Sequence, residues 1–141
     1  MPSDEVGLTK LYDGNDGPSL PFLKSLNDKP SGVAWCVLSG GHLLAVVWLN
    51  IFKDEAEIID FRVDISKRRQ GVGRYLLDET LSALNLSDIK AVFLEVRRSN
   101  VAAITLYEHA GFATIGIRKN YYETALGRED ALLMRHDSNK R

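Results

Sequence analysis

The chain has 141 residues, 45% of them hydrophobic, which is the size and profile of one soluble globular domain. Its net charge of −1 argues against a protein that coats nucleic acid. The longest apolar run, residues 43–49, is too short to span a membrane, and a single cysteine without an N-terminal signal segment predicts a cytoplasmic location.

The first half of the chain predicts strands separated by strong turn signals. The expected elements are a strand over 6–12, a loop over 13–18, one short helix at most over 19–26, and strands over 33–38, 43–52 and 57–63. The tetrad SGGH at residues 39–42 is typical of a hairpin turn. The last three of these strands are therefore expected to form an antiparallel meander.

The second half alternates helices with strands. The expected elements are a helix over 72–84, a strand over 91–96, a helix from a Ser99 or Asn100 cap to Ala110 with Gly111 as its stop, a strand over 112–118, a polar loop over 120–129 and a short strand over 131–134. Two helices within one small sheet predict a mixed α/β domain.

A basic, glycine-bearing turn, RRQGVG at residues 68–73, joins the meander to the helix that follows. Gly71 and Gly73 lack a Cβ, so a ligand can approach the backbone N–H groups closely. The first turn of a helix has unpaired N–H donors that attract phosphate, and Arg68, Arg69 and Arg74 add positive charge. The turn predicts a pyrophosphate site, although such turns also occur without a ligand. The Rossmann fingerprint and the P-loop pattern are both absent from the sequence.

Two further residues are candidates for chemistry. Glu95 interrupts an apolar strand, and burying a carboxylate costs several kcal/mol unless it is paired, hydrated or functional. The alternative interpretation is that Glu95 faces solvent or pairs with Arg97 or Arg98. Tyr107 lies on a helix, where an aromatic side chain usually packs in the core, and only its phenol could take part in chemistry.

Four segments together resemble the GNAT acetyltransferase superfamily: the turn at 68–73, LEVRRSN at 94–100, AAITLYEHAGF at 102–112 and RKNYYETALGREDALLM at 118–134. Within it they are similar to the bacterial ribosomal-protein-alanine N-acetyltransferases, over roughly residues 57–135. The resemblance implies one GNAT domain over residues 1–141, with a mixed, mostly antiparallel twisted sheet flanked by helices. It also implies acetyl-CoA as co-substrate and the N-terminus of a protein, such as a ribosomal protein, as acceptor.

The resemblance also assigns roles to individual residues. Glu95 corresponds to the family's general base and Tyr107 to its general acid, while Tyr121 and Tyr122 correspond to a loop that covers the incoming peptide. Contacts to acetyl-CoA are implied for Phe61, Arg62, Val63, Arg68, Arg69, Gln70, Gly71, Val72, Gly73, Arg74 and Asn100. The three histidines have no metal-ligand spacing, so no metal is expected.

The N-terminal part departs from the family pattern, because its helical region is shortened to SLPFLKSLN at residues 19–27. In the family this helical region forms part of the acceptor pocket, so a shorter region predicts a more open acceptor site. Two alternatives remain beside N-terminal acetylation: a GNAT enzyme that acetylates a small amine, a polyamine or a lysine side chain, and a module that senses acetyl-CoA without turnover.

Overall fold

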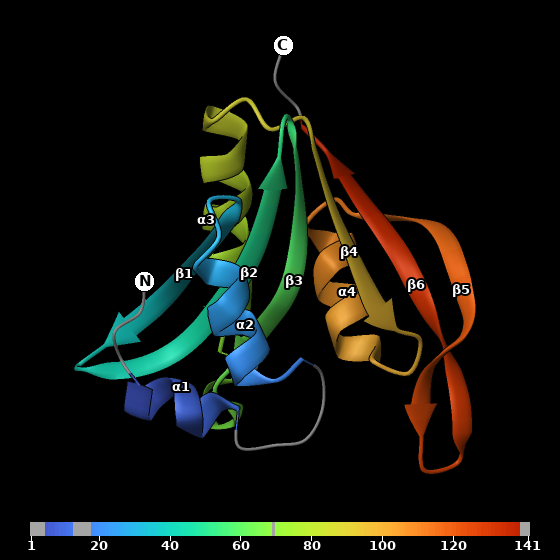
Figure 1. Ribbon diagram of the computed structural model, residues 1–141, viewed down its shortest axis with the longest axis horizontal. Helices are drawn as coiled ribbons and strands as arrows, with labels where there is room; N and C mark the ends of the chain where they lie inside the picture. Colours follow the sequence, from blue (N-terminus) through green and yellow to red (C-terminus); the bar gives the residue numbers. More distant parts are fainter. Residues whose placement is uncertain (1–4, 13–17, 69, 139–141) are drawn as a thin grey trace.

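The computed structural model describes residues 5–12, 18–68 and 70–138, which form six strands and four α-helices (Figure 1). In chain order the elements are α1 (Glu5–Leu11), α2 (Leu20–Asn27), β1 (Gly32–Ser39), β2 (His42–Phe52), β3 (Glu55–Val63), a 3-10 turn η1 (Ile65–Lys67), α3 (Val72–Leu86), β4 (Ala91–Arg97), α4 (Val101–His109), β5 (Ala113–Thr124) and β6 (Gly127–Asp137). They form one sheet with strand order β1-β2-β3-β4-β6-β5.

The first three strands form the predicted antiparallel meander. Gly40 and Gly41 adopt positive φ angles of 56° and 80° at the turn between β1 and β2, a conformation that favours glycine over other residues. β3 then pairs with β4 in parallel, and the remaining neighbours are antiparallel. The mostly antiparallel α/β sheet expected from the sequence is confirmed.

Helices cover the meander on both of its faces. Alternate residues of β2 point to opposite sides, so Val46 and Trp48 pack with α1 and α2, whereas Val47 and Leu49 pack with α3. Figure 1 shows α2 in front of the meander and α3 behind it, with α4 behind β4. The core is therefore two apolar layers separated by the sheet, and the larger layer lies on the side of α3 and α4.

The strand predicted over residues 6–12 is wrong, because most of this segment is helix α1. Leu8, Leu11 and Tyr12 follow the i, i+3, i+4 spacing of one helical face, and all three pack against the layer around Trp48. The Tyr12 amide donates to the Leu8 carbonyl at 3.0 Å, which continues the helical bonding by one residue. The N-terminal helical region is thus a pair of short helices, and β1 is the first described strand.

The polar loop predicted over residues 120–129 is also wrong, because β5 and β6 continue through most of it as a long hairpin. The two strands pair as far as Thr124 and Gly127. Most side chains of β5 are exposed, so the segment lacks the apolar alternation by which a strand is recognised in a sequence. The tyrosines expected in a loop, Tyr121 and Tyr122, therefore lie on a strand.

No helix in the described ranges is long and apolar enough to cross a bilayer.

Candidate active site

The sheet opens between its two central strands. The parallel pairing of β3 with β4 ends at Ile58 and Leu94. Beyond that point β3 stays paired with β2 as far as Val63, and β4 stays paired with β6 as far as Arg97. Ile59 is an extra residue relative to β2, and the bulge it forms bends β3 at the point of divergence. The last residues of β3 and β4 are therefore separated by an opening within the sheet.

Backbone groups of β3 face this opening. The Asp64 amide donates to the Leu44 carbonyl of β2 at 2.7 Å. Because hydrogen-bonding directions alternate along a strand, Arg62 also turns its backbone to β2, while Phe61 and Val63 turn theirs toward the opening. The Val63 carbonyl accepts a bond from Arg68 Nε at 3.3 Å. This edge of β3 can pair with an extended ligand, as a sheet edge pairs with an added strand.

The glycine turn leads directly from the opening into α3. Gly71 has a φ of 84° and occupies the N-cap, where no side chain caps the helix. The first amides of α3 are therefore available to an anion. A Cβ at Gly73 would lie 3.3 Å from Val63 Cγ2, so this glycine allows α3 to pack closely on β3. The arrangement fits a ligand whose pyrophosphate binds at the N-terminus of α3 and whose extended remainder runs along β3.

The other predicted residues of the turn make contacts within the chain. Arg74 Nε donates to both carboxylate oxygens of Asp78 on the same helix, at 2.9 and 3.0 Å. Gln70 Nε2 donates to the Ser66 carbonyl at 3.2 Å, and Val72 packs against the larger apolar layer. Arg69 lies outside the described residues. In the described part of this turn, the backbone amides at the start of α3 and the Arg68 guanidinium are the groups that could bind an anion.

Asn100 caps α4, because its Oδ1 accepts a bond from the Ala103 amide at 3.2 Å. The cap uses only the oxygen of this side chain, so the amide nitrogen can still donate to a ligand. The sequence left Ser99 and Asn100 as alternative caps, and the structure assigns the cap to Asn100.

Glu95 lies on β4 at the start of the opening, with its side chain 21% exposed. Its Oε1 is 3.3 Å from Arg118 Nη2, which comes from β5 at the far edge of the sheet. The alternative in which Glu95 pairs with Arg97 or Arg98 does not hold, because these arginines approach Glu129 and Asp130 instead, at 3.7 and 3.0 Å. Glu95 is therefore held beside a cation while it remains accessible to water.

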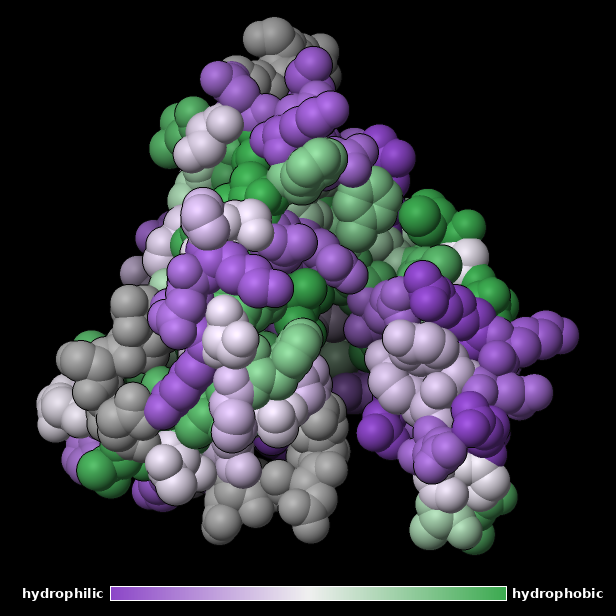
Figure 2. Space-filling model, viewed as in Figure 1, coloured by the Kyte–Doolittle hydropathy of each residue, from purple (hydrophilic) through white to green (hydrophobic). Residues whose placement is uncertain are grey.

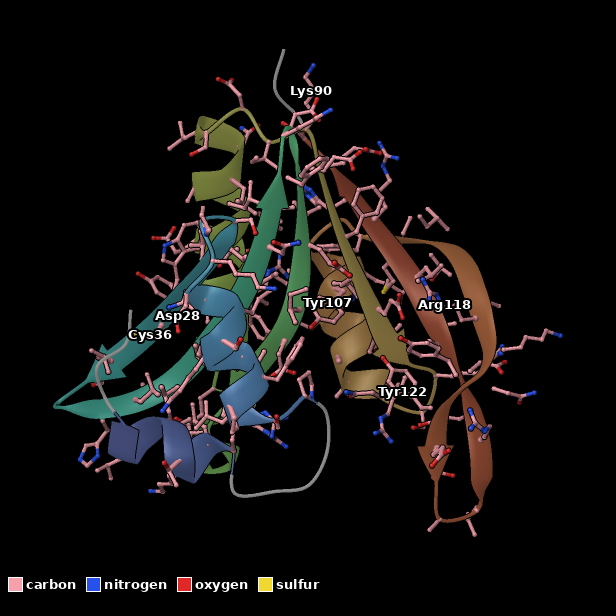
Figure 3. The ribbon with its side chains drawn as sticks, in the orientation of Figure 1. Asp28, Cys36, Lys90, Tyr107, Arg118 and Tyr122 are labelled. Carbon is pink, nitrogen blue, oxygen red and sulfur yellow. The ribbon has the colours of Figure 1, made fainter. Side chains whose placement is uncertain are left out.

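Tyr107 approaches the opening from the helix side of the sheet (Figure 3). Its ring packs against Phe61 and Phe112, with centroid distances of 6.3 and 5.6 Å, and the residue is 7% exposed. Burial, followed by the nearby Asp60 carboxylate, raises the pKa of the phenol well above its usual value. Tyr107 is thus both a core residue and a neutral O–H donor at neutral pH.

Tyr121 and Tyr122 lie near Glu95 on the open face of the sheet. Their rings meet edge to face with a centroid distance of 5.1 Å. The Arg118 guanidinium lies 5.2 Å from the ring of Tyr121, and that of Arg97 lies 4.8 Å from the ring of Tyr122. Burial and then the Glu95 carboxylate raise the pKa of Tyr122. Arg118 thus connects the predicted base to the predicted peptide contacts.

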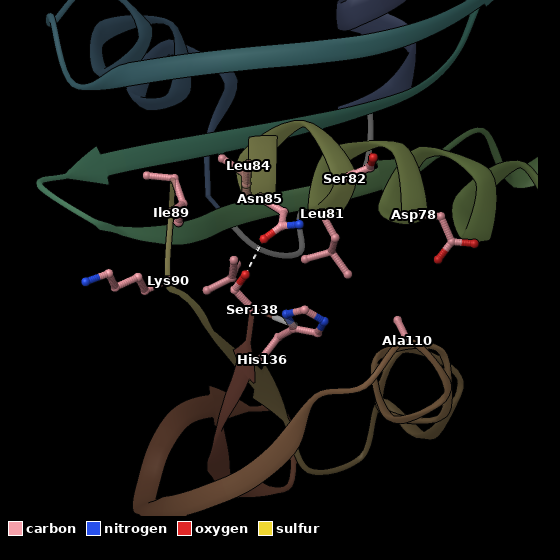
Figure 4. A pocket seen from close by; sticks show the side chains of 11 residues that line it. Asp78, Leu81, Ser82, Leu84, Asn85, Ile89, Lys90, Ala110, His136 and Ser138 are labelled. Atoms are coloured by element: carbon pink, nitrogen blue, oxygen red, sulfur yellow. Dashed lines mark hydrogen bonds between the residues drawn. The ribbon is translucent and has the colours of Figure 1, made fainter. Parts of the chain in front are cut away.

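The surface is hollowed between the α1 and α2 side and the β5–β6 hairpin (Figure 2). Tyr122 and Arg118 lie on the hairpin side of this view (Figure 3). A separate pocket lies at the opposite end of α3, where Leu84, Asn85, His136 and Ser138 contribute to its lining (Figure 4). That pocket shares no residue with the predicted site. In the described ranges, no group of three or more His, Cys, Asp and Glu side chains could hold a metal ion.

Two residues near Glu95 had no predicted role. Arg118 belongs to a conspicuous sequence motif, but its contact with Glu95 depends on the register of β4, β6 and β5, which the sequence does not reveal. Glu57 lies on β3 beside β4, and the Glu95 charge contributes to raising its pKa. The sequence signal for Glu57 is weak, since an acidic residue in an alternating strand usually faces solvent.

Comparison with known proteins identifies the family. The Acetyltransferase (GNAT) family matches residues 7–112. The ribosomal protein bS18-alanine N-acetyltransferase of Salmonella typhimurium is 47% identical over 125 residues, 89% of this chain and 76% of the relative. That of Escherichia coli K12 is 44% identical over 94 residues, 67% of this chain, and the aligned part spans 64% of the length of the E. coli protein.

Solved structures share the fold. The crystal structure of the ribosomal-protein-S18-alanine N-acetyltransferase from E. coli superposes with a TM-score of 0.90 at 31% identity, covering 99% of this chain and 90% of that chain. An acetyltransferase from Bacillus subtilis in complex with CoA has a TM-score of 0.81 at 16% identity, with 97% and 94% coverage, which shows the fold alone. The chain therefore belongs to the GNAT acetyltransferase family.

Proposed function

We propose that this protein is an acetyl-CoA-dependent N-acetyltransferase of the ribosomal-protein-alanine type, which acetylates the N-terminal α-amine of a protein or peptide. The observation that carries the proposal is the opening between β3 and β4, with the Glu95 carboxylate on one side and the Tyr107 phenol on the other. The bS18-alanine acetyltransferase from Salmonella supports the choice of acceptor. The proposal includes a single domain over residues 1–141, with its motifs at 57–135, acting in the cytoplasm without a metal.

Acetyl-CoA would bind on the side of α3 and α4. The amides following Gly71 would hold the pyrophosphate, with Arg68 as the nearest described cation of the turn. The backbone of Phe61 and Val63 would pair with the pantetheine arm, and Asn100 would donate from its amide nitrogen. Bound in this way, acetyl-CoA would have its thioester at the opening.

The acceptor amine would enter from the open face of the sheet. A terminal α-amine has a pKa near ~8, so much of it carries an extra proton at neutral pH and must lose that proton before it can attack. Glu95 would accept it, directly or through a water molecule. Tyr121 and Tyr122 would contact the first residues of the acceptor from the hairpin side.

The deprotonated amine would attack the thioester carbonyl directly in a ternary complex. The N–H of Val63 would stabilise the oxyanion, since this group turns toward the opening. Tyr107 would protonate the departing CoA thiolate, because its buried phenol retains its proton across the working pH range. No covalent acetyl-enzyme is part of this route.

The test is mass spectrometry of acceptors incubated with acetyl-CoA and the protein. The panel contains peptides that differ in their first residue, an N-terminally blocked peptide with an internal lysine, and a free polyamine. We expect acetylation of peptide N-termini alone and a loss of about 10²-fold or more in kcat for Glu95→Gln. Glu79→Gln, an exposed change on α3, is the matched control and should retain wild-type kcat. Modification of only the lysine or the polyamine would overturn the proposed acceptor.

A further inference from the structure

Glu57 lies where the sheet begins to open. In the parallel pairing of β3 with β4 it is adjacent to Phe93, two residues before Glu95 on the same strand. Ile58 and Leu94 both point into the larger apolar layer, so Glu57 and Glu95 point to the opposite, open face. The two carboxylates are diagonal neighbours on adjacent strands, within reach of each other through their flexible side chains.

The two carboxylates share one nearby cation. Arg118 pairs with Glu95 at 3.3 Å and also acts on Glu57, where it lowers the pKa. Desolvation and then the Glu95 charge outweigh this effect and raise the pKa of Glu57. A carboxylate whose pKa is raised is a better proton acceptor than one that is free in water.

Asn50 provides an independent observation. It lies directly across from Glu57 in the antiparallel pairing of β2 with β3, which places both side chains on the same face. Its Oδ1 is buried, and no described residue donates a hydrogen bond to it. A protonated Glu57 has an O–H group that can donate to this oxygen, whereas an ionised Glu57 has no such donor. The surroundings of Glu57 therefore accommodate the protonated form.

The proton count of the reaction gives a second acceptor a role. An ammonium nitrogen carries three protons and the amide product carries one, so two protons leave the nitrogen in each turnover. One finally resides on the CoA thiol, and the other must reach the solvent. If Glu95 took both in succession, it would have to release the first before it could accept the second.

We propose that Glu57 relays protons from Glu95 to the solvent; this inference rests on the proposed function. The acceptor N–H bond breaks as an O–H bond forms on Glu95, and the nitrogen retains the electron pair with which it attacks. The proton then passes from Glu95 to an ionised Glu57, so that Glu95 is again ionised when the attacking nitrogen must lose its second proton. That proton leaves Glu95 by the same path, and Tyr107 recovers from water the proton that it gives to the CoA thiolate. Glu57 is exposed and releases the proton to water.

The test is a double-mutant cycle of Glu57→Gln and Glu95→Gln, assayed with the amine that the wild-type protein acetylates best. We expect Glu57→Gln to lower kcat by about tenfold with the KM for acetyl-CoA unchanged. In the Glu95→Gln background the same change should have no further effect, because the relay acts through Glu95. Glu57→Asp should recover part of the loss, and Glu55→Gln, an exposed change on the same strand, should have no effect.

The pH profile of kcat separates the relay from a structural role. Glu57→Gln should change the acidic limb of the profile, since it removes one member of the coupled pair. The charged and polar groups that surround Glu57 are the same in both proteins, so they cannot cause a difference between the two profiles: Glu55, Glu95, Arg97, Arg118, Tyr122 and Arg135. A kcat for Glu57→Gln within twofold of wild type, or an equal loss in both backgrounds, would overturn the relay.

Folding and the proposed function are checked separately. If Glu57→Gln lowers the melting temperature, the same cycle is run with Glu57→Thr, which also removes the carboxyl group and suits a strand. Acetylation of an amine other than a peptide N-terminus would overturn the proposed acceptor but leave the cycle interpretable. A wild-type protein that acetylates no amine would overturn both proposals.

Discussion

The meander of β1, β2 and β3 and the strands β4, β6 and β5 form two halves of one sheet with opposite surroundings. Helices cover the meander on both faces, and β2 is buried along most of its length. The second half is covered by α4 on one face only, and its other face carries Glu95, Arg118 and Tyr122. Stability is therefore concentrated in the covered half, and the groups suited to chemistry lie on the open half.

The largest effect is expected from truncating the core of the covered half. Leu49 on β2 is 0% exposed, so Leu49→Ala should cost about 2–5 kcal/mol in unfolding free energy, measured by chemical denaturation. Ile117 on β5 is 46% exposed, and Ile117→Ala is the matched aliphatic change in the open half. It should cost below about 1 kcal/mol. Equal losses of unfolding free energy in the two variants would contradict the conclusion that stability is concentrated in the covered half.

Removal of the Tyr107 hydroxyl should lower the acetylation rate without lowering the stability of the protein. Tyr107 lies at the boundary between the two halves of the sheet. Tyr107→Phe retains the ring that packs on Phe61 and Phe112, so the melting temperature should change little. The loss of the proton donor should lower kcat by about 10²-fold in a steady-state acetylation assay. An unchanged kcat would mean that the thiolate leaves without this acid.

Two glycines with similar backbone conformations allow a test of the proposed anion site at the N-terminus of α3. Gly71 and Gly41 have φ angles of 84° and 80°, and neither has an atom within 4 Å of its would-be Cβ. Alanine at either position should therefore cost a similar ~1–2 kcal/mol in stability. Only Gly71→Ala should raise the KM for acetyl-CoA, by about tenfold, because it distorts the amides of the anion site. Equal KM values for the two variants would contradict this assignment.

The smallest effect is expected in the β5–β6 hairpin. Asn120 has a positive φ of 55° where the pairing shifts, and its amide donates to Asp130 Oδ1 at 3.0 Å. This bond, followed by contacts from Arg98, lowers the pKa of Asp130. A carboxyl whose pKa is lowered on folding stabilises the protein above its unfolded pKa, and this contribution is lost as the pH falls through the folded pKa.

Protection of the Asn120 amide from exchange, relative to its intrinsic rate at each pH, should therefore be highest at neutral pH and fall as the pH drops below the ordinary aspartate pKa of about 3.9. Asp130→Ala should remove this pH dependence and raise the acceptor KM a few-fold, since Tyr121 and Tyr122 follow the shifted residues. Asp137→Ala, an exposed change near the end of β6, is the control. An unchanged acceptor KM for Asp130→Ala would argue that the shifted pairing at Asn120 does not position the tyrosines.

Much of the covered half and the glycine turn could be predicted from the sequence. Alternating apolar residues bounded by turn signals predicted the meander. A cap at Ser99 or Asn100 and a stop at Gly111 predicted the extent of α4. The helix α1 was missed because its apolar spacing extends over two turns only. The hairpin was missed because both of its faces are largely exposed, which removes the periodicity that burial imposes.

The site was predictable where a residue conflicts with its local surroundings. Glu95 is identifiable because a carboxylate interrupts an apolar strand. Its partner Arg118 was not, since 22 intervening residues separate the two along the chain and strand register decides their contact. Glu57 remained unnoticed for the same reason. A residue that is unusual for its own segment can be recognised in the sequence. Contacts between residues on different strands cannot, because they depend on strand pairings that only the folded chain defines.

The divergence of β3 and β4 has a consequence for the order of events in the proposed reaction. Acetyl-CoA would approach from the side of α3 and the acceptor from the opposite face, so neither substrate obstructs the entry of the other. The kinetics should then permit random addition, and CoA and the acetylated product could depart independently. Only the first residues of the acceptor need to reach the opening, so the remainder of a folded polypeptide, whatever its size, can stay outside.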